Sequence, residues 1–281
     1  MDNYKYYGQH GEDFLLWNFF DYKNQGFYID IGAFDGIHLS NSYSFEKGGW
    51  SGICVEAHPE YFKNCQQVRP NSTCLNVACV GDEKIETVDF YTEELGLLSG
   101  IQEEREEDVR NRYEKRGLEF SGFQKMTVPA TTLNQIINQY VPKNTNIDFI
   151  SIDVEGTEIE VLKGLDLSRI RPRVLILEAN TEEAQTEIED YLVKVHNYHL
   201  ARQFGVNFIY TSNREDVEKL QNIQVNCQLE KQLHPKGDKY TQDKFIEGAI
   251  VQDGKIINPR KKQKSLFQRL LKKISFVVGA K

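Results

Sequence analysis

The amino-acid sequence predicts an α/β fold in which helices cover both faces of a doubly wound, mostly parallel sheet. Short, unbroken apolar runs alternate with helix-like segments between residues 27 and 195, as strands buried on both faces require. Two of these runs, FYIDIG and NIDFISIDVEG, end in acidic residues and glycine. Residues 198–212 have the pattern of two strands joined by a tight turn, so we expect an antiparallel closing hairpin.

Each element is assigned from its apolar periodicity and from the turn residues around it. Apolar residues lie on one face of the segment 8–22, and Pro59 stands at the start of the segment 59–68, where proline favours a helix. Glycines such as Gly26 and Gly81 separate neighbouring elements. The expected strands are 27–32, 51–57, 72–80, 86–93, 146–156 and 172–180, and the expected helices are 8–22, 36–48, 59–68, 103–116, 157–165 and 182–195.

The regular alternation stops between residues 82 and 146. This insertion holds one expected strand, the small-residue stretch LGLLSG, a highly charged helix and an extended piece that runs into another helix. A segment of this kind between sheet strands can form a substrate lid. We therefore expect an N-terminal helical segment at 1–25, a main domain at 26–212 and a C-terminal extension at 213–281 that ends in a basic amphipathic helix.

The charge of the chain is unevenly distributed. Because residues 260–281 contain eight basic and no acidic residues, the net charge of −8 leaves −16 for residues 1–259. A body this acidic repels a phosphate backbone, so we expect no nucleic-acid partner. The basic end has the composition of a helix attracted to anionic lipid, which predicts peripheral membrane contact through residues 260–281; docking on the acidic body is the alternative.

The five cysteines form no metal-binding or redox pattern with one another or with histidine. Their odd number and apolar surroundings favour reduced thiols and a cytoplasmic protein. The N-terminal residues lack the basic and apolar regions of a signal peptide, and no apolar run is long enough to span a membrane.

The segment DIGAFDG, residues 30–36, joins the first expected strand to a helix and predicts a ligand-binding turn. Gly32 and Gly36 allow the backbone to approach a ligand closely. The spacing differs from G-x-G-x-x-G and from a P-loop, and Asp30 and Asp35 stand where a pyrophosphate would lie. This arrangement favours a ligand with a cationic part and no phosphate, as S-adenosylmethionine has with its sulfonium and amino groups.

Glu56 ends the second expected strand, twenty residues beyond Gly36. A carboxylate at this position can accept hydrogen bonds from both hydroxyls of a ribose. An ordinary acidic strand end is the alternative, but the glycine turn upstream favours the binding role.

The strand at 146–156 ends in Asp153 and Glu155, and Glu158 opens the next helix. Ligands bind at the carboxyl ends of such strands, so we expect Asp153 and Glu155 to face the crevice. One of them could take a proton from an acceptor hydroxyl, and His38 is a further candidate base. Mg²⁺ held by Asp153, Glu155 and Glu178 is an alternative that we do not favour, and Glu158 could simply stabilise the helix N-terminus.

The segments YGQHGEDFLL, FYIDIGAFDGIHLSNSYSFEKGGWSGICVEAHPE, NVACVGDE, TTLNQII and IDFISIDVEGTEIEVLKGLD together resemble the FkbM-type methyltransferase family. The resemblance extends from about Tyr7 to Thr211. It implies a class I methyltransferase (Rossmann-like) fold and S-adenosylmethionine as cofactor. In this family most reported reactions are O-methylations of polyketide-type natural products and sugars.

The resemblance also implies roles for individual residues. Asp30, Gly32 and Gly36 would line the methionine end of the cofactor, with Ser40 and Asn41 binding its carboxylate or capping a helix. Glu56 would bind ribose, Ala78 would flank adenine, and Asp153 and Glu155 would face the transferred methyl group. Gln9, Glu12 and Asp13 match the N-terminal signature and would close over the cofactor. The candidate cofactor-binding residues are Asp30, Gly32, Ala33, Phe34, Asp35, Gly36, Ser40, Asn41, Glu56, Ala78 and Asp153.

The sequence thus predicts methyl transfer to a hydroxyl of a sugar, a glycan or a related natural product. Two alternatives stay open: an NAD-dependent oxidoreductase on a similar sheet, which would need the missing G-x-G-x-x-G, and a non-catalytic protein that kept the cofactor fold. Residues 213–281 lie outside the resemblance, so no role is assigned to them from it.

Overall fold

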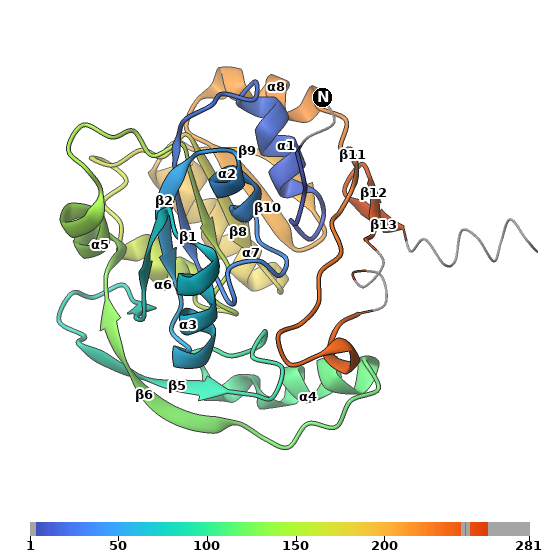
Figure 1. The fold of residues 1–281 in the computed structure, drawn as a ribbon. Helices are drawn as coiled ribbons and strands as arrows, with labels where there is room; N and C mark the ends of the chain where they lie inside the picture. Colours follow the sequence, from blue (N-terminus) through green and yellow to red (C-terminus); the bar gives the residue numbers. More distant parts are fainter. Residues whose placement is uncertain (1–3, 243–244, 246–247, 258–281) are drawn as a thin grey trace, which may run out of the picture.

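The computed structural model describes residues 4–242, 245 and 248–257. Within them, seven strands form a central sheet in the order β3-β2-β1-β7-β8-β10-β9 (Figure 1). The first five strands in this order are parallel, and β10 pairs antiparallel with β8 and β9. The doubly wound, mostly parallel sheet and its antiparallel closing hairpin are therefore confirmed. The strands are β1 Phe27–Ile31, β2 Ser51–Val55, β3 Ser72–Leu75, β7 Phe149–Ile152, β8 Val174–Glu178, β9 His199–Phe204 and β10 Asn207–Thr211.

Apolar side chains alternate between the two faces of the sheet, and each face is covered by helices. On one face, Tyr28 and Phe149 pack with Trp17 and Phe45 from the helices α1 and α2. On the other, Ile29 and neighbouring strand residues pack against α5, α6 and α7. The covering helices are α1 Glu12–Phe19, α2 Tyr43–Lys47, α3 Pro59–Val68, α5 Leu133–Tyr140, α6 Glu158–Lys163, α7 Glu182–Glu189 with its π-helical continuation Asp190–Val195, and α8 Arg214–Asn222.

The helix expected at 8–22 is shorter, at Glu12–Phe19, and two further elements differ more strongly from the expectation. The run 72–80 is not one strand: β3 stays in the central sheet, but β4 (Ala78–Cys79) pairs with β6 in a second sheet. The helix expected at 36–48 is confined to α2, since turns occupy residues 36–42. Hydrogen bonds to Asp35 and Ser40 fix these turns, which is an interaction that apolar periodicity cannot detect.

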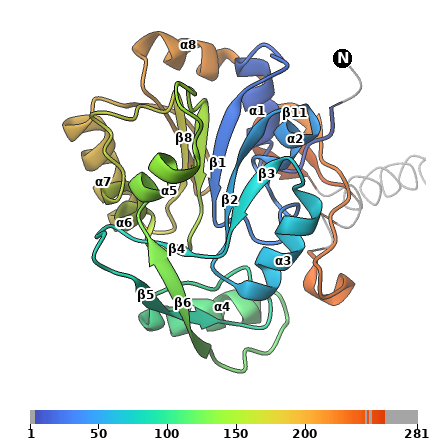
Figure 2. The same cartoon turned by 60° about the vertical axis from the view of Figure 1, so that its left-hand side comes forward.

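At the end of the insertion, α5 covers a face of the central sheet, and the residues before α5 form a layer at the carboxyl edge of that sheet. The layer consists of β5 (Thr87–Thr92) and β6 (Gln124–Thr131), paired antiparallel, and of the charged helix α4 (Glu106–Lys115), which follows a 3₁₀ turn at Glu103–Arg105. Figures 1 and 2 show this layer across the end of the sheet, with α4 beside the β5–β6 pair.

The described residues after α8 pack on the N-terminal segment. Strands β11 (Asn226–Gln228), β12 (Ile250–Gln252) and β13 (Lys255–Ile257) form a small antiparallel sheet, and Tyr6 bridges to Leu229. Val225, Leu229 and Val251 belong to the same hydrophobic cluster as α1. The helix expected at 260–281 lies outside the described residues. Among the described residues, no helix combines the length and apolar character needed to cross a membrane.

Candidate active site

A cavity of about 200 Å³ lies at the carboxyl ends of β1, β2, β7 and β8. The insertion supplies the opposite wall through Phe90, the loop 96–101 and two arginines of the α4 region. The cavity brings together most of the residues singled out in the sequence. Those that line it are Asp30, Gly32, Ala33, Phe34, His38, Ser40, Asn41, Glu56, Ala78, Asp153, Glu155 and Glu178.

Gly32 is required by a close contact between neighbouring strand ends. Its φ is +84°, and a Cβ at this position would lie 1.7 Å from the carbonyl oxygen of Asp153. No side chain fits there without separating β1 from β7. Gly32 therefore brings the glycine turn and Asp153 to the same end of the cavity.

Asp35 and Gly36 do not line the cavity, in contrast to their expected cofactor contact. The Asp35 carboxylate accepts hydrogen bonds from the backbone N–H groups of Ile37 (2.9 Å) and His38 (2.7 Å). A Cβ on Gly36 would lie 3.0 Å from the Cα of Cys65. Both residues shape the turn and pack it on α3.

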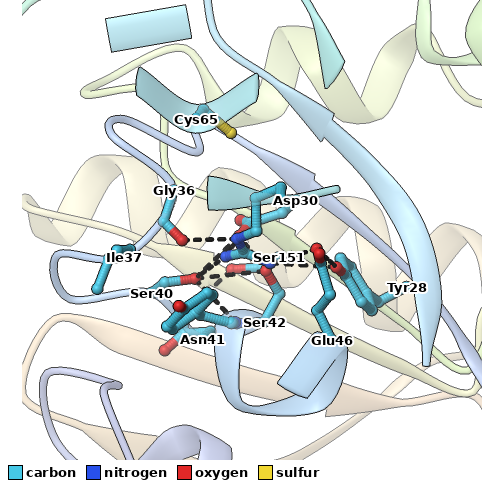
Figure 3. A network of polar contacts seen from close by, with 12 residues as sticks. Tyr28, Asp30, Gly36, Ile37, Ser40, Asn41, Ser42, Glu46, Cys65 and Ser151 are labelled. Carbon is cyan, nitrogen blue, oxygen red and sulfur yellow. Dashed lines mark hydrogen bonds and ion pairs between the residues drawn. The ribbon is translucent and has the colours of Figure 1, made fainter. Parts of the chain in front are cut away.

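Arg69, which the sequence reasoning missed, organises the glycine turn from behind. Its guanidinium is completely buried and donates to the carbonyl of Gly36 (2.6 Å), to Ser40 Oγ (2.7 Å) and to the hydroxyl of Tyr28 (3.1 Å). Asp30 and Glu46 lie 3.9 and 3.7 Å away and compensate its charge. Figure 3 shows Tyr28, Asp30, Gly36, Ser40 and Glu46 converging on this network. A single arginine after a polar helix has no local signal that would have identified it.

The Asp30 carboxylate faces this network as well as the cavity. It accepts hydrogen bonds from Ser42 Oγ (2.5 Å) and Ser40 Oγ (3.3 Å). Burial raises its pKa to about 6, although Arg69 and the two serines act in the opposite direction. Because Ser40 is already bonded to Arg69 and Asp30, its hydroxyl is an anchor of the turn.

Glu56, the expected ribose-binding residue, is held in place by backbone groups on either side of it. Its two carboxylate oxygens accept from the backbone N–H groups of Phe34 (2.8 Å) and His58 (2.7 Å). Burial raises the pKa of Glu56 to about 7, against the lowering effect of these two hydrogen bonds. Each oxygen keeps a second lone pair for a ligand hydroxyl.

The end of the cavity beyond Glu56 is apolar. Ala78 packs with Phe90 and Val128, and Ala57 and Ile101 lie against them. Phe90 and Ile101 belong to the insertion, so this pocket exists only because the second sheet folds across the end of the first. It suits a flat apolar ring.

Asp153 and Glu178 form a carboxyl pair at the opposite end. Their oxygens and an oxygen of Glu155 lie within 4.8 Å of one another. Asp153 is open to the cavity, but the protein around it limits its hydration. This desolvation, together with the negative charges of Glu178 and Glu155, raises the pKa of Asp153 well above its usual range. Burial likewise raises the pKa of Glu178, so the two carboxyls share one proton near neutral pH.

Glu155 is bound by arginines of the insertion. Its Oε2 accepts from Arg105 (2.7 Å) and from Arg112 (2.9 Å). The backbone of Glu155 has a φ of +59°, an uncommon conformation for a residue other than glycine. These contacts tie α4 and the preceding turn to the end of β7. Glu158 accepts hydrogen bonds from the backbone N–H groups of Val154 and Gly156, which matches the alternative that it stabilises the start of α6.

Four buried polar atoms on the cavity-lining residues have no hydrogen-bond partner among the described residues. They are His38 Nδ1, Asn41 Oδ1, Arg116 Nη1 and Glu178 Oε2. A buried polar atom without a partner destabilises a protein by roughly 1–3 kcal/mol, so their concentration around one cavity indicates that a polar ligand completes them.

His38 is buried, and its pKa is lowered to about 3 by burial and by the nearby His234 and Arg116. It is therefore neutral at physiological pH and a weak proton acceptor. The rings of Phe34, His234 and Phe245 surround that of His38, with centroids 6.0–6.3 Å away.

The N-terminal segment and the described part of the C-terminal extension brace the cavity from outside the sheet. Gln9 lines it, whereas Glu12 accepts from Asn207 Nδ2 (2.7 Å) and Asp13 accepts from the backbone N–H of Tyr7 (2.7 Å). Gln232, in the C-terminal extension, accepts from the backbone N–H of Leu39 (2.6 Å) and donates to the carbonyl of Tyr7. The extension therefore holds the glycine turn, a role for which the sequence offered no signal.

A comparison with known families agrees with this geometry. The model of the methyltransferase FkbM domain matches residues 30–200, which include the end of β1, the glycine turn and both acidic strand ends. The chain belongs to the methyltransferase FkbM family. The resemblance noted in the sequence is thereby confirmed, as is the class I methyltransferase fold class.

Individual relatives of this FkbM-family protein are distant. Methyltransferase sdnD of Sordaria araneosa is 34% identical over 77 residues, which cover 24% of this chain and 30% of that protein. The chain thus spans about a third of this curated relative. A solved METTL16 MTase domain has a TM-score of 0.41 at 11% identity, covering 71% of this chain and 65% of its own. An O-methyltransferase from Bacillus cereus in complex with SAH has a TM-score of 0.38 at 13% identity, with coverages of 74% and 82%.

Proposed function

We propose that this protein transfers a methyl group from S-adenosylmethionine to a hydroxyl of a sugar, a glycan or a related natural product. The observation that carries the proposal is one cavity that joins the glycine turn, Glu56 and an apolar pocket at one end to a carboxyl pair at the other. Membership of the methyltransferase FkbM family supports the proposal that the group transferred is a methyl group.

The residues of the cavity fit the parts of the cofactor. The pocket around Ala78 and Phe90 suits adenine, and the free lone pairs of Glu56 suit the ribose hydroxyls. The unpartnered Asn41 Oδ1 can accept from an amino group. Acidic side chains around the middle of the cavity favour a cationic ligand, and they disfavour the pyrophosphate that the NAD-dependent alternative requires.

The chemical step needs a proton acceptor and a fixed geometry. When bound, S-adenosylmethionine supplies a methyl group activated by its sulfonium. As the bond between the acceptor oxygen and the methyl carbon forms and the carbon–sulfur bond breaks, the hydroxyl proton passes to the Asp153–Glu178 pair. This pair has a raised pKa suited to general-base catalysis near neutrality, whereas the low pKa of His38 makes that residue a poor base. Holding the acceptor oxygen in line with the carbon–sulfur bond increases the rate further.

The ribose role of Glu56 leads to a first prediction. Glu56→Gln is expected to weaken binding of S-adenosylhomocysteine by roughly 10- to 100-fold, because a charged acceptor of two hydrogen bonds becomes a neutral one. Isothermal titration calorimetry measures the affinity. Glu60→Gln, at an exposed site on the same stretch of chain, is the matched control. Equal affinities of the Glu56 variant and the wild type would remove Glu56 from the cofactor site.

A second prediction concerns metal ions. Chelation with EDTA is expected to leave methyl transfer unchanged, since Arg105 and Arg112 already neutralise Glu155 and a proton links Asp153 to Glu178. Activity is measured as tritium transfer from labelled cofactor before and after dialysis. Loss of activity that Mg²⁺ restores would instead support a metal held by Asp153, Glu155 and Glu178.

Binding of the cofactor also separates this proposal from a non-catalytic scaffold. A scaffold that kept the cofactor site would bind S-adenosylhomocysteine but transfer no tritium into any fraction of host glycans and lipids. Peripheral attachment of residues 260–281 to an anionic membrane is part of the proposal and is supported by the eight basic residues there.

A further inference from the structure

Each carboxylate in the cavity is balanced by an arginine, by backbone N–H groups or by a proton. One guanidinium there has no such partner among the described residues. Asp30 is paired with Arg69, Glu56 with two backbone N–H groups, and Glu155 with Arg105 and Arg112. The raised pKa values of the neighbouring Asp153 and Glu178 favour retention of one proton by this pair. Arg116, which follows α4 and lines the cavity, has a side chain that makes no hydrogen bond or ion pair with the described residues, and its Nη1 is buried.

The acidic residues near Arg116 are already engaged. Glu93 accepts from the backbone N–H groups of Leu95 and Leu98 and from the hydroxyl of Tyr113. The Glu155 oxygen is held by the two arginines described above. Burial lowers the pKa of Arg116, whereas the carboxylates beside Arg112 raise the pKa of that residue despite its burial. Arg116 nevertheless stays charged at any physiological pH.

An unpaired, half-buried guanidinium is matched by a planar or tetrahedral anion, which can accept two parallel hydrogen bonds from it. His38, whose Nδ1 is buried without a partner, lines the same cavity, and the charge of Arg116 helps to lower the pKa of His38. Neutral His38 can donate one more hydrogen bond from Nδ1. Arg116 and His38 therefore both offer hydrogen-bond donors to a ligand in the cavity, and the carboxylates near them already have other partners.

We infer that Arg116, with His38, binds an anionic group of the acceptor, so that the substrate is a hydroxyl compound bearing a carboxylate, a phosphate or a sulfate. This inference rests on the proposed function and narrows its acceptor. Arg112 and Glu155 fix the position of α4 and hence of Arg116. An acidic sugar would place its anion at Arg116 and a nearby hydroxyl toward the Asp153–Glu178 pair.

The cofactor itself carries a carboxylate, so the experiment must separate the two sources. Binding of S-adenosylhomocysteine and of 5′-methylthioadenosine, which has no carboxylate, is first measured for the wild type and Arg116→Gln. We expect the substitution to change neither affinity. A selective loss of S-adenosylhomocysteine affinity would assign Arg116 to the cofactor and overturn the inference.

The second arm uses glucuronate and glucose 6-phosphate as probes and glucose as the neutral control, titrated into protein saturated with S-adenosylhomocysteine. We expect the anionic sugars to bind roughly tenfold or more tightly than glucose, and this preference to disappear in Arg116→Gln. Arg110→Gln removes an exposed charge from the same helix and is expected to keep the preference. An equal affinity for all three sugars, or a preference that Arg116→Gln retains, would overturn the inference.

The design keeps the two hypotheses apart. If the wild type binds no S-adenosylhomocysteine, the proposed cofactor is wrong. The sugar titration is then repeated on the protein alone, and the inference still requires a preference for anionic sugars that Arg116→Gln abolishes. Because Arg116 makes no side-chain bond within the described residues, Arg116→Gln is expected to unfold at the wild-type temperature, so lost binding would not reflect lost folding.

Discussion

Replacement of Arg69 by methionine is expected to lower the free energy of unfolding by about 3–5 kcal/mol. The substitution leaves Asp30 and Glu46 buried without their counter-charge, and it removes the donors to the Gly36 carbonyl, Ser40 and Tyr28. Losing one partner of a buried charge network costs more than losing both, because the remaining charges stay desolvated. Urea unfolding followed by circular dichroism measures the change.

Two variants test this cause directly. Arg169→Met removes an arginine with an exposed side chain and is expected to change the stability by well under 1 kcal/mol. Adding Glu46→Gln to Arg69→Met is expected to recover part of the loss, since one uncompensated carboxylate disappears. A fully stable Arg69→Met variant would contradict the view that this arginine holds the glycine turn.

Asp153→Asn is expected to lower kcat by about 10²- to 10⁴-fold, because it removes one member of the pair that accepts the hydroxyl proton. KM for the acceptor should change much less, since asparagine keeps the size and polarity of the side chain. The rate is measured as tritium transfer from labelled cofactor into fractionated host glycans and lipids. Asp89→Asn, at an exposed site on β5, is the control.

The pH dependence supplies an independent readout. A general base acts in its ionised form. We therefore expect kcat/KM to be low at pH values below the raised pKa of the pair and to increase as the pH passes through that pKa. In Glu178→Gln the negative charge that raises the pKa of Asp153 is gone, and the limb should move to lower pH. If Asp153→Asn and Glu178→Gln both keep full turnover, the pair does not accept the proton.

The amino-acid sequence by itself determined the elements whose signals are local. The strands β1, β2, β7 and β8 are continuous apolar runs, and α3 begins at Pro59 as expected. Once these strands are parallel neighbours, the Asp30 turn, Glu56 and Asp153 must meet at their carboxyl ends, because parallel strands end at the same edge.

Only the tertiary structure decided which segments enclose that edge of the sheet and how the charges of its side chains are balanced. Strand β4 leaves the central sheet because β6 offers it a partner some fifty residues later, and Gln232 reaches the glycine turn from the C-terminal extension. Arg69 and Arg116 have similar polar surroundings in the sequence, yet one is buried among two carboxylates and the other faces the cavity unpaired. Such differences arise from contacts between distant segments, and these determine the local dielectric environment and the charge balance around each side chain.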